Sequence, residues 1–241
     1  MRKLGLTVLA LSACMAAACR ENIDSNDVRT SGVYPEIKVV ASEKDESVVT
    51  VYLKTGGNKS NTYLELKGDD ELVATVGDTS KNLDQDGDVS KATFPFNTGG
   101  SEFIIAFNRG EDDDSAPAST CTLPEPFNLT GLEAQSTVSR ADGVTLTWEP
   151  AEDGDTMRWT LEATSGGCLF PSGDKSMTDT GSLTLGPDDF DATQSAKDNG
   201  ESCDAKVCVE RFRKGSLDPA FEEGGEIEAV QRRCINFVSA P

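Results

Sequence analysis

The residues best suited to chemistry lie in the stretch KNLDQDGDVSKAT, at positions 81–93, where oxygen-bearing side chains alternate. Oxygen ligands at alternate positions, followed by a glycine at a sharp turn, are the pattern of a calcium-binding loop. The candidate ligands are Asn82, Asp84, Asp86 and Asp88. The position that should supply a bidentate glutamate is occupied by Thr93. We therefore favour a solvated acidic loop between two strands, with a calcium site as the alternative.

Catalytic chemistry is restricted because none of the 241 residues is a histidine. Ser-His-Asp sites, Cys-His sites and histidine-bound metals are thereby excluded. No glycine-rich phosphate loop lies between a strand pattern and a helix pattern. A pair of carboxylates for glycoside cleavage is an alternative that the sequence leaves open. The acids cluster in turns such as EDGD and PDDFD, which favours solvated loops. We expect a protein that is not an enzyme and has no cofactor, apart from the calcium considered above.

The seven cysteines fall into two groups. Cys14 and Cys19 lie at the end of an apolar stretch, residues 4–18, that follows the positive start Met1-Arg2-Lys3. This stretch matches a secretory signal and is too short to span a bilayer, which needs about 20 residues. In an exported chain the other cysteines are expected to form disulfides, and zinc binding by four of them is the alternative. These five are Cys121, Cys168, Cys203, Cys208 and Cys234.

The end of the signal resembles that of bacterial lipoproteins, in which a small-residue triplet precedes a cysteine that is acylated and becomes the mature N-terminus. Such triplets precede both Cys14 and Cys19. A cut before Cys14 would leave four apolar residues in the mature tail, whereas a cut before Cys19 leads directly into polar chain. The resemblance implies a signal peptide at 1–18 and lipidation of Cys19, with Cys14 as the runner-up. A plain cleaved signal is the alternative.

The lipoprotein resemblance also implies a location. Two acyl chains would attach the protein stably to a membrane without a spanning helix. Arg20 follows the favoured cysteine in place of the aspartate that retains many lipoproteins at the inner membrane. The resemblance therefore implies a lipid anchor in the bacterial outer membrane. The polar residues up to 32 are expected to form a flexible tether at 19–32.

Composition and patterning predict an all-β protein. The formal net charge of −20 disfavours nucleic acid as a partner. Short alternating apolar runs recur with turn residues at intervals of about 8–12 positions, which is typical of β-sandwiches. We expect two tandem sandwiches, at 33–124 and 125–241.

In the first domain, seven short strands are suggested between EIKVVAS and STCTLP. In VVTVYLK, Val49, Val51 and Leu53 share one face while Tyr52 and the polar residues share the other. One face of this strand should be buried and the other wet. The number and length of the strands resemble an immunoglobulin-like sandwich, without the Cys, Trp, Cys spacing of true immunoglobulin domains.

The second domain resembles a fibronectin type III domain. The resemblance rests on a first strand near Pro126 and Leu129, the strand VTLTW with Trp148 facing inward, and the third strand RWTLEAT. In such a sandwich the third and sixth strands are antiparallel neighbours, and the sixth and seventh form a hairpin. The resemblance thus implies the disulfides Cys168–Cys203 and Cys208–Cys234. It leaves Cys121 as a buried unpaired residue.

These features favour a non-enzymatic, lipid-anchored protein of the cell envelope that acts as a binding or spacing module. Its partner is then an envelope protein or a glycan that the sequence does not identify. One alternative is a calcium-dependent adhesion or interaction module. Another is a carbohydrate-binding accessory protein, for which Trp159 and Tyr63 are the candidate aromatic platform.

Overall fold

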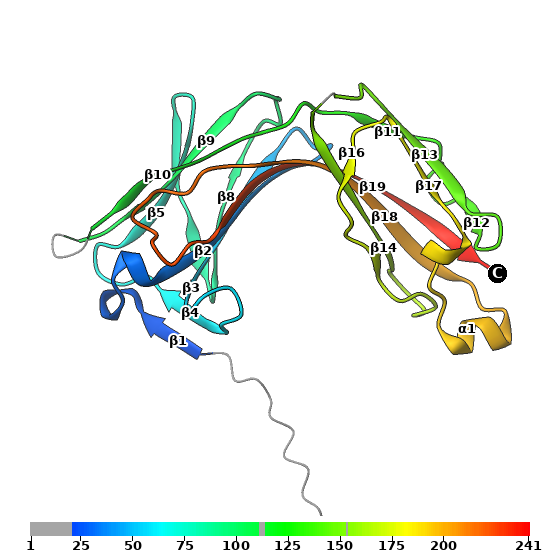
Figure 1. Cartoon of the computed structure of the whole chain (residues 1–241), viewed down its shortest axis with the longest axis horizontal. Coiled ribbons are helices and arrows are strands. Elements are labelled where there is room, and N and C mark those ends of the chain that lie inside the picture. Colours follow the sequence, from blue (N-terminus) through cyan, green and yellow to red (C-terminus); the bar gives the residue numbers. More distant parts are fainter. Residues whose placement is uncertain (1–20, 111–113, 153) are drawn as a thin grey trace, which may run out of the picture.

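A computed structural model describes residues 21–110, 114–152 and 154–241, which form two β-sandwiches arranged as an arch (Figure 1). The predicted all-β fold with two sandwiches is confirmed. The signal peptide and both lipidation candidates, Cys14 and Cys19, lie outside the described residues. Within those residues, no helix is long and apolar enough to cross a membrane.

The first sandwich consists of two packed sheets. Its core contains the alternate inward residues of each strand, including Val49, Val51 and Leu53 as expected. One sheet has the order β10-β9-β5-β6 and the other includes β1, β4, β3 and β2, with β8 beside β3 and β7 beside β8. The strands are β1 (Glu21–Asp24), β2 (Val33–Ala41), β3 (Ser47–Thr55), β4 (Thr62–Glu65), β5 (Glu71–Val76), β6 (Thr79–Asn82), β7 (Asp84–Asp86), β8 (Val89–Phe94), β9 (Glu102–Asn108) and β10 (Ala116–Thr122).

The second sandwich packs a three-stranded sheet, β11-β13-β17, against β14, β18 and β19. Trp148 fills the space between the two sheets, as the sequence predicts, and is 1% exposed. The strands are β11 (Asn128–Thr130), β12 (Thr137–Ser139), β13 (Val144–Glu149), β14 (Thr156–Ala163), β15 (Ser172–Gly173), β16 (Met177–Thr178), β17 (Ser182–Leu185), β18 (Cys203–Lys214) and β19 (Glu226–Ala240). The helices within the described residues are short: η1 (Ser25–Asp27), η2 (Thr30–Gly32), η3 (Pro187–Asp189) and α1 (Gln194–Asn199).

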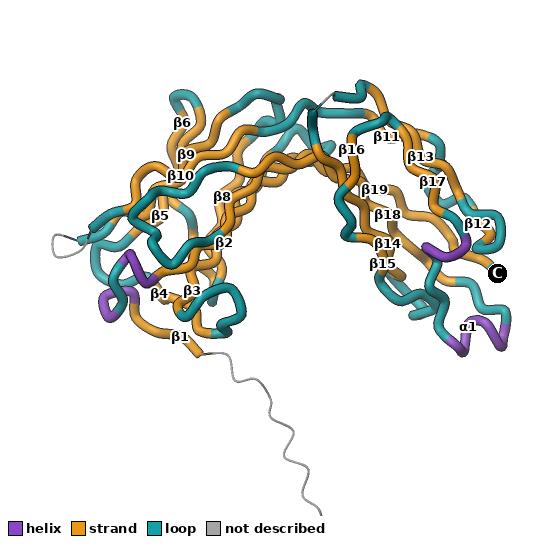
Figure 2. Tube along the Cα trace, viewed as in Figure 1, coloured by secondary structure: helices purple, strands orange, loops and turns teal. Residues whose placement is uncertain are grey.

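One continuous sheet runs through both sandwiches (Figure 2). The first half of β19 pairs in parallel with β2, residues 226–231 against residues 36–41. The sheet therefore has the order β1-β4-β3-β2-β19-β18-β14-β15, and we call it the shared sheet. Its face away from the two cores lines the inside of the arch (Figure 1) and is called the inner face.

The shared sheet corrects the predicted domain boundary. Residues 125–241 do not form a self-contained sandwich, because the far end of the β18–β19 hairpin completes the first one. Phe221, Ile227 and Ala229 are buried in the first core. Thr120 of β10 and Ser216 of the hairpin exchange two backbone hydrogen bonds of 2.8 Å. Strand β19 contributes to both cores, with Ile227 and Ala229 in the first and Phe237 in the second. Strand β2 gains β19 as a pairing partner.

The predicted tether at 19–32 is also wrong over its described part. Residues 21–24 form β1, which pairs in parallel with β4, and Ser25 and Thr30 are buried. Arg109 holds the segment, since its Nη2 donates to the Ser25 carbonyl at 2.8 Å and its Nη1 to the Val28 carbonyl at 3.0 Å. Asp70 balances that buried charge, with Oδ2 3.0 Å from Arg109 Nε. A polar composition did not prevent docking because Arg109 satisfies the backbone carbonyls.

A buried ion pair lies where the two sandwiches meet. Arg211 and Asp179 are both fully buried, with Nη2 and Oδ2 2.6 Å apart. Arg211 also donates to the carbonyl oxygens of Glu125, at the start of the second sandwich, and Pro150. The indole Nε1 of Trp148 donates to Asp179 Oδ1 at 2.6 Å. This network, which we call the joint, ties β18 to the chain crossing between the sandwiches.

Both expected disulfides are present, Cys168–Cys203 and Cys208–Cys234. They follow from the strand order, because β14 pairs with β18 and β18 forms a hairpin with β19. Cys208 and Cys234 lie directly opposite each other in that hairpin. Cys121 is a free cysteine buried in β10, where burial raises the pKa of its thiol to about 12.

Candidate functional site

Charged residues of alternating sign cross the inner face of the shared sheet. Strand register places Arg232 of β19, Glu210 of β18 and Arg158 of β14 directly opposite one another on three adjacent strands. Lys38 of β2 lies opposite Glu228 of β19 in the same way. Opposite charges in directly facing positions stabilise a sheet. We call these five residues the ion cluster.

The ion cluster is closely connected. Arg158 lies between the two carboxylates: its Nε is 2.5 Å from Glu210 Oε2, and its Nη1 and Nη2 donate to Glu228 at 3.0 and 2.6 Å. Lys38 Nζ lies 3.0 Å from Glu228 Oε1, and Arg232 donates to Glu210. The Arg158 guanidinium also covers the ring of Phe212 at 4.5 Å. The cluster is thus a preorganised layer of donors and acceptors over apolar side chains.

The carboxylates of the cluster are held in the ionised form. Burial raises the pKa of Glu210, but the cations Arg232, Lys38 and Arg158 outweigh burial and leave that pKa below its usual value. Burial likewise raises the pKa of Glu228, and Arg158 and Lys38 bring it below its usual value. A general acid for glycoside cleavage must be protonated near neutral pH. Neither glutamate meets that requirement.

All three tyrosines of the chain lie on the same inner face. Lys54 of β3 is flanked by Tyr34 of β2 and Tyr63 of β4 in directly opposite positions. Tyr52 lies two residues along β3, with its ring centroid 6.2 Å from that of Tyr63 and the rings inclined at 59°. Lys54 Nζ is 5.7 Å from the Tyr63 centroid. We call the three tyrosines the tyrosine row.

Two shallow hollows lie over the ion cluster, and one of them reaches Tyr52 of the tyrosine row. One, of about 490 Å³, is lined by Tyr52 and Thr50 together with Lys38, Glu228 and Arg232. The other, of about 340 Å³, shares Lys38 and Arg232 and continues to Thr160 and Glu162 of β14. Together they form the inner groove, which crosses from β3 to β14. Four strand spacings of about 4.8 Å make it roughly 19 Å wide.

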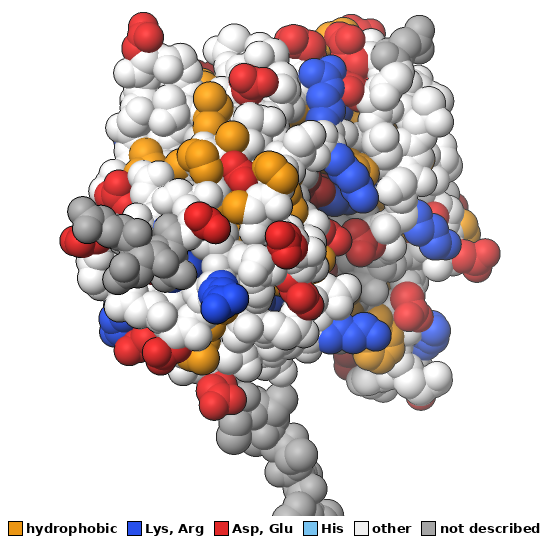
Figure 3. Space-filling model, turned by 60° about the vertical axis from the view of Figure 1, so that its left-hand side comes forward, with side chains coloured by type: hydrophobic (Ala, Val, Ile, Leu, Met, Phe, Trp, Pro, Cys, Tyr) orange, Lys and Arg blue, Asp and Glu red, His pale blue; other side chains and the backbone are white. Residues whose placement is uncertain are grey.

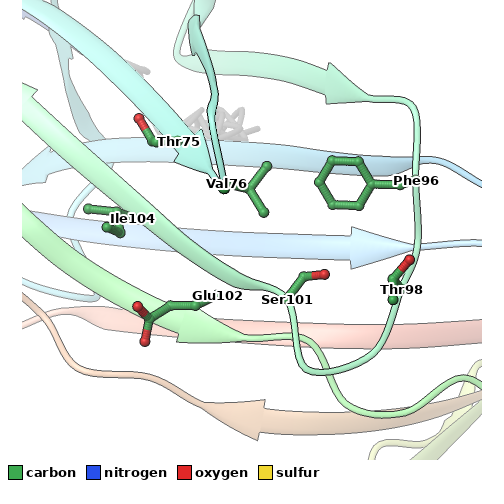
Figure 4. A pocket seen from close by; sticks show the side chains of 8 residues that line it. Thr75, Val76, Phe96, Thr98, Ser101, Glu102 and Ile104 are labelled. Carbon is green, nitrogen blue, oxygen red and sulfur yellow. The ribbon is translucent and has the colours of Figure 1, made fainter.

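A third hollow, of about 660 Å³, lies on the opposite side of the first sandwich. Figure 4 shows Val76 and Phe96 pointing toward each other there, with Ile104 and Glu102 on a neighbouring strand. Hydrophobic side chains gather on one face of this sandwich in Figure 3, and Ile104 is 38% exposed. Of the described residues that line this outer hollow, Glu102 alone is charged. The outer hollow therefore offers little of the directional hydrogen bonding that fixes a ligand's orientation.

The predicted calcium ligands do not form a loop. Asn82 ends β6, where its side chain donates to Glu71 at 2.8 Å. Asp84 and Asp86 lie in β7, which turns through Gly87 and Asp88 into β8 as a tight hairpin. Among the described residues, no three His, Cys, Asp or Glu side chains are grouped to hold a metal ion. The alternation that suggested ligands is the period of an extended strand.

Comparisons with known proteins add little. No family model matches the chain, and no curated protein matches it. A solved segment of two fibronectin type III domains from chicken tenascin is similar over 86% of this chain and 99% of that chain, at 12% identity and a TM-score of 0.25. A likeness at that TM-score shows neither the fold nor the function of this chain.

The two residues proposed as an aromatic platform are separated by the fold. Trp159 is 7% exposed and packs in the second core, whereas Tyr63 belongs to the tyrosine row. Tyr34 and Tyr52 were not singled out from the sequence, although the alternation in VVTVYLK already placed Tyr52 on the wet face. The ion cluster was missed because its members are up to 194 residues apart, from Lys38 to Arg232.

Proposed function

We propose that this chain is a non-enzymatic binding module of the bacterial cell envelope, lipid-anchored through Cys19, that presents the inner groove to a partner. The observation that carries the proposal is the shared sheet. Because one sheet runs through both sandwiches and the joint is buried, the groove has a fixed shape. A preorganised surface loses less entropy when it binds.

The chemistry of the groove supports binding over catalysis. Its two central carboxylates are ionised and are occupied by Arg158. The sequence has no histidine to serve as a general base. The groove instead offers tyrosine and arginine, which are enriched at recognition surfaces. These side chains project from strands, which position them more rigidly than loops do.

The anchor is supported by the triplet before Cys19 and has a structural consequence. The first described strand, β1, begins at Glu21 and lies at one foot of the arch (Figure 1). Cys19 precedes Glu21 by two residue steps, so their Cα atoms can be at most roughly 7 Å apart. An anchor there would hold that foot close to the bilayer, without the tether expected from the sequence.

Mass spectrometry of the mature N-terminal peptide, purified from the membrane fraction, tests the anchor. We expect a diacylated Cys19 in the wild-type chain and in Cys14→Ala, whereas Cys19→Ala should leave the membrane fraction. Acylation at Cys14, or an unmodified N-terminus at Cys19, would overturn the proposed anchor.

Photo-crosslinking in whole cells tests the binding function. A benzophenone amino acid is placed at Thr50, in the inner groove, and for comparison at Thr75, in the outer hollow. We expect a discrete adduct from position 50 and none from position 75. Adducts from position 75 alone, or from neither position, would contradict the proposed use of the groove.

A further inference from the structure

We propose that the inner groove binds a neutral glycan chain, with Tyr52 at its edge and Tyr63 on the adjacent strand β4 packing against sugar rings and the ion cluster hydrogen-bonding to hydroxyl groups. This inference rests on the proposed function and names the class of partner that the same groove takes. A spacing protein or a calcium-dependent interaction module would not need a glycan in this groove.

The tyrosine row provides the apolar part of such a site. A pyranose ring has faces of C–H groups and a rim of hydroxyls, so it needs an aromatic surface beside hydrogen-bonding groups. Tyr52 and Tyr63 provide two rings 6.2 Å apart. Their 59° inclination makes two walls rather than one flat platform, and Lys54 and Glu36, 2.6 Å apart, lie beside them.

The ion cluster provides the polar part. A hydroxyl group both donates and accepts, and therefore matches a surface on which N–H donors and ionised carboxylates alternate. Lys38 and Arg232 have side chains 34% and 38% exposed, so their tips reach solvent. Their ion pairs with Glu228 and Glu210 already order them, which lowers the entropy that binding must remove.

Charge and shape favour a neutral polymer. The cluster has three cations and two carboxylates, but Glu36, Glu162 and Glu226 also line the groove, and the whole chain carries −20. This field repels a polyanion. The groove is open and crosses five strands, which suits an extended chain rather than an enclosed small molecule. A protein partner is the competing occupant.

Calorimetric titration of the full chain with neutral hexaoses of glucose, mannose, xylose and N-acetylglucosamine tests the inference, with polygalacturonate as the anionic probe. We expect one or more neutral hexaoses to bind, with an affinity unchanged by added salt, because a neutral ligand has no charge to screen. Tyr52→Ala should weaken that binding by about tenfold or more. Tyr52→Phe keeps the aromatic ring and should therefore retain glycan binding.

Ile104→Ser, in the outer hollow, is the matched control and should bind as the wild type does. Tyr52 lies on the wet face of β3, and an unchanged melting temperature of Tyr52→Ala will show that the fold is intact. Absence of neutral binding, preference for polygalacturonate, or an unchanged affinity of Tyr52→Ala would each overturn the inference. A position-50 adduct to a protein would also overturn it while leaving the proposed function standing.

Discussion

Replacing Arg211 with methionine should destabilise the arch more than any other single loss of positive charge on the shared sheet. Asp179 would keep the hydrogen bond from Trp148 but lose its counter-charge while remaining fully buried. The carbonyl oxygens of Glu125 and Pro150 would also lose their Arg211 donor. Methionine fills most of the space of the arginine stem, so the effect is electrostatic rather than a cavity.

The magnitude follows from the burial of the pair. Removing one partner of a buried ion pair costs about 3–5 kcal/mol. In a chain of this size each kcal/mol lowers the melting temperature by about 2–4 °C. The expected fall is therefore roughly 6–20 °C, measured by scanning calorimetry and checked by urea unfolding.

Arg232→Met is the matched control, because it removes the same charge from a side chain that is 38% exposed. It should cost no more than about 1 kcal/mol. Asp179→Asn removes the buried charge and keeps an acceptor for Trp148, so Arg211→Met combined with Asp179→Asn should be more stable than Arg211→Met alone. A loss below about 1 kcal/mol for Arg211→Met, or a double variant less stable than that single variant, would refute this account of the joint.

Three further predictions follow from the cysteines and the ion cluster. Replacing Cys208 and Cys234 with serine removes a disulfide with a sequence separation of 26. The free energy of unfolding, measured in urea, should fall by about 3–4 kcal/mol. Non-reducing peptide maps of the wild-type chain should show the Cys208–Cys234 bond, and a bond between Cys121 and Cys234 would contradict the strand order. Because nearby cations lower the folded-state pKa of Glu210, its contribution to stability is present above the ordinary carboxyl pKa and is lost as the pH falls through the lowered one. Glu210→Gln should therefore flatten the acid side of the profile of melting temperature against pH, and an unchanged profile would count against the cluster. Cys121, buried and with its pKa raised to about 12, should react with thiol reagents at pH 8 only after unfolding, whereas rapid labelling of the native chain would show that β10 is open.

Local pattern predicted the strands, whereas the disulfide pairing was implied by the resemblance to a fibronectin type III domain. A period of two assigns each residue to a face, which is why the buried side of VVTVYLK and the inward Trp148 follow from the sequence. The strand order of a fibronectin type III domain then implied that Cys168 pairs with Cys203 and Cys208 with Cys234. The alternation at Asp84 and Asp86 suggested calcium ligands as the alternative to an acidic loop, because alternating acids on a strand and in a metal loop have the same spacing. In the structure these residues lie in β7.

Only the tertiary structure decided which strands are neighbours across the arch. The sequences of residues 36–41 and 226–231 do not predict that β2 and β19 pair in parallel, because the pattern of a strand specifies its faces and not its partner. Docking of residues 21–32 depends on Arg109, about 80 positions away. The ion cluster and the tyrosine row exist for the same reason: each strand supplies one or two side chains, and their chemistry appears when long-range pairing sets them side by side.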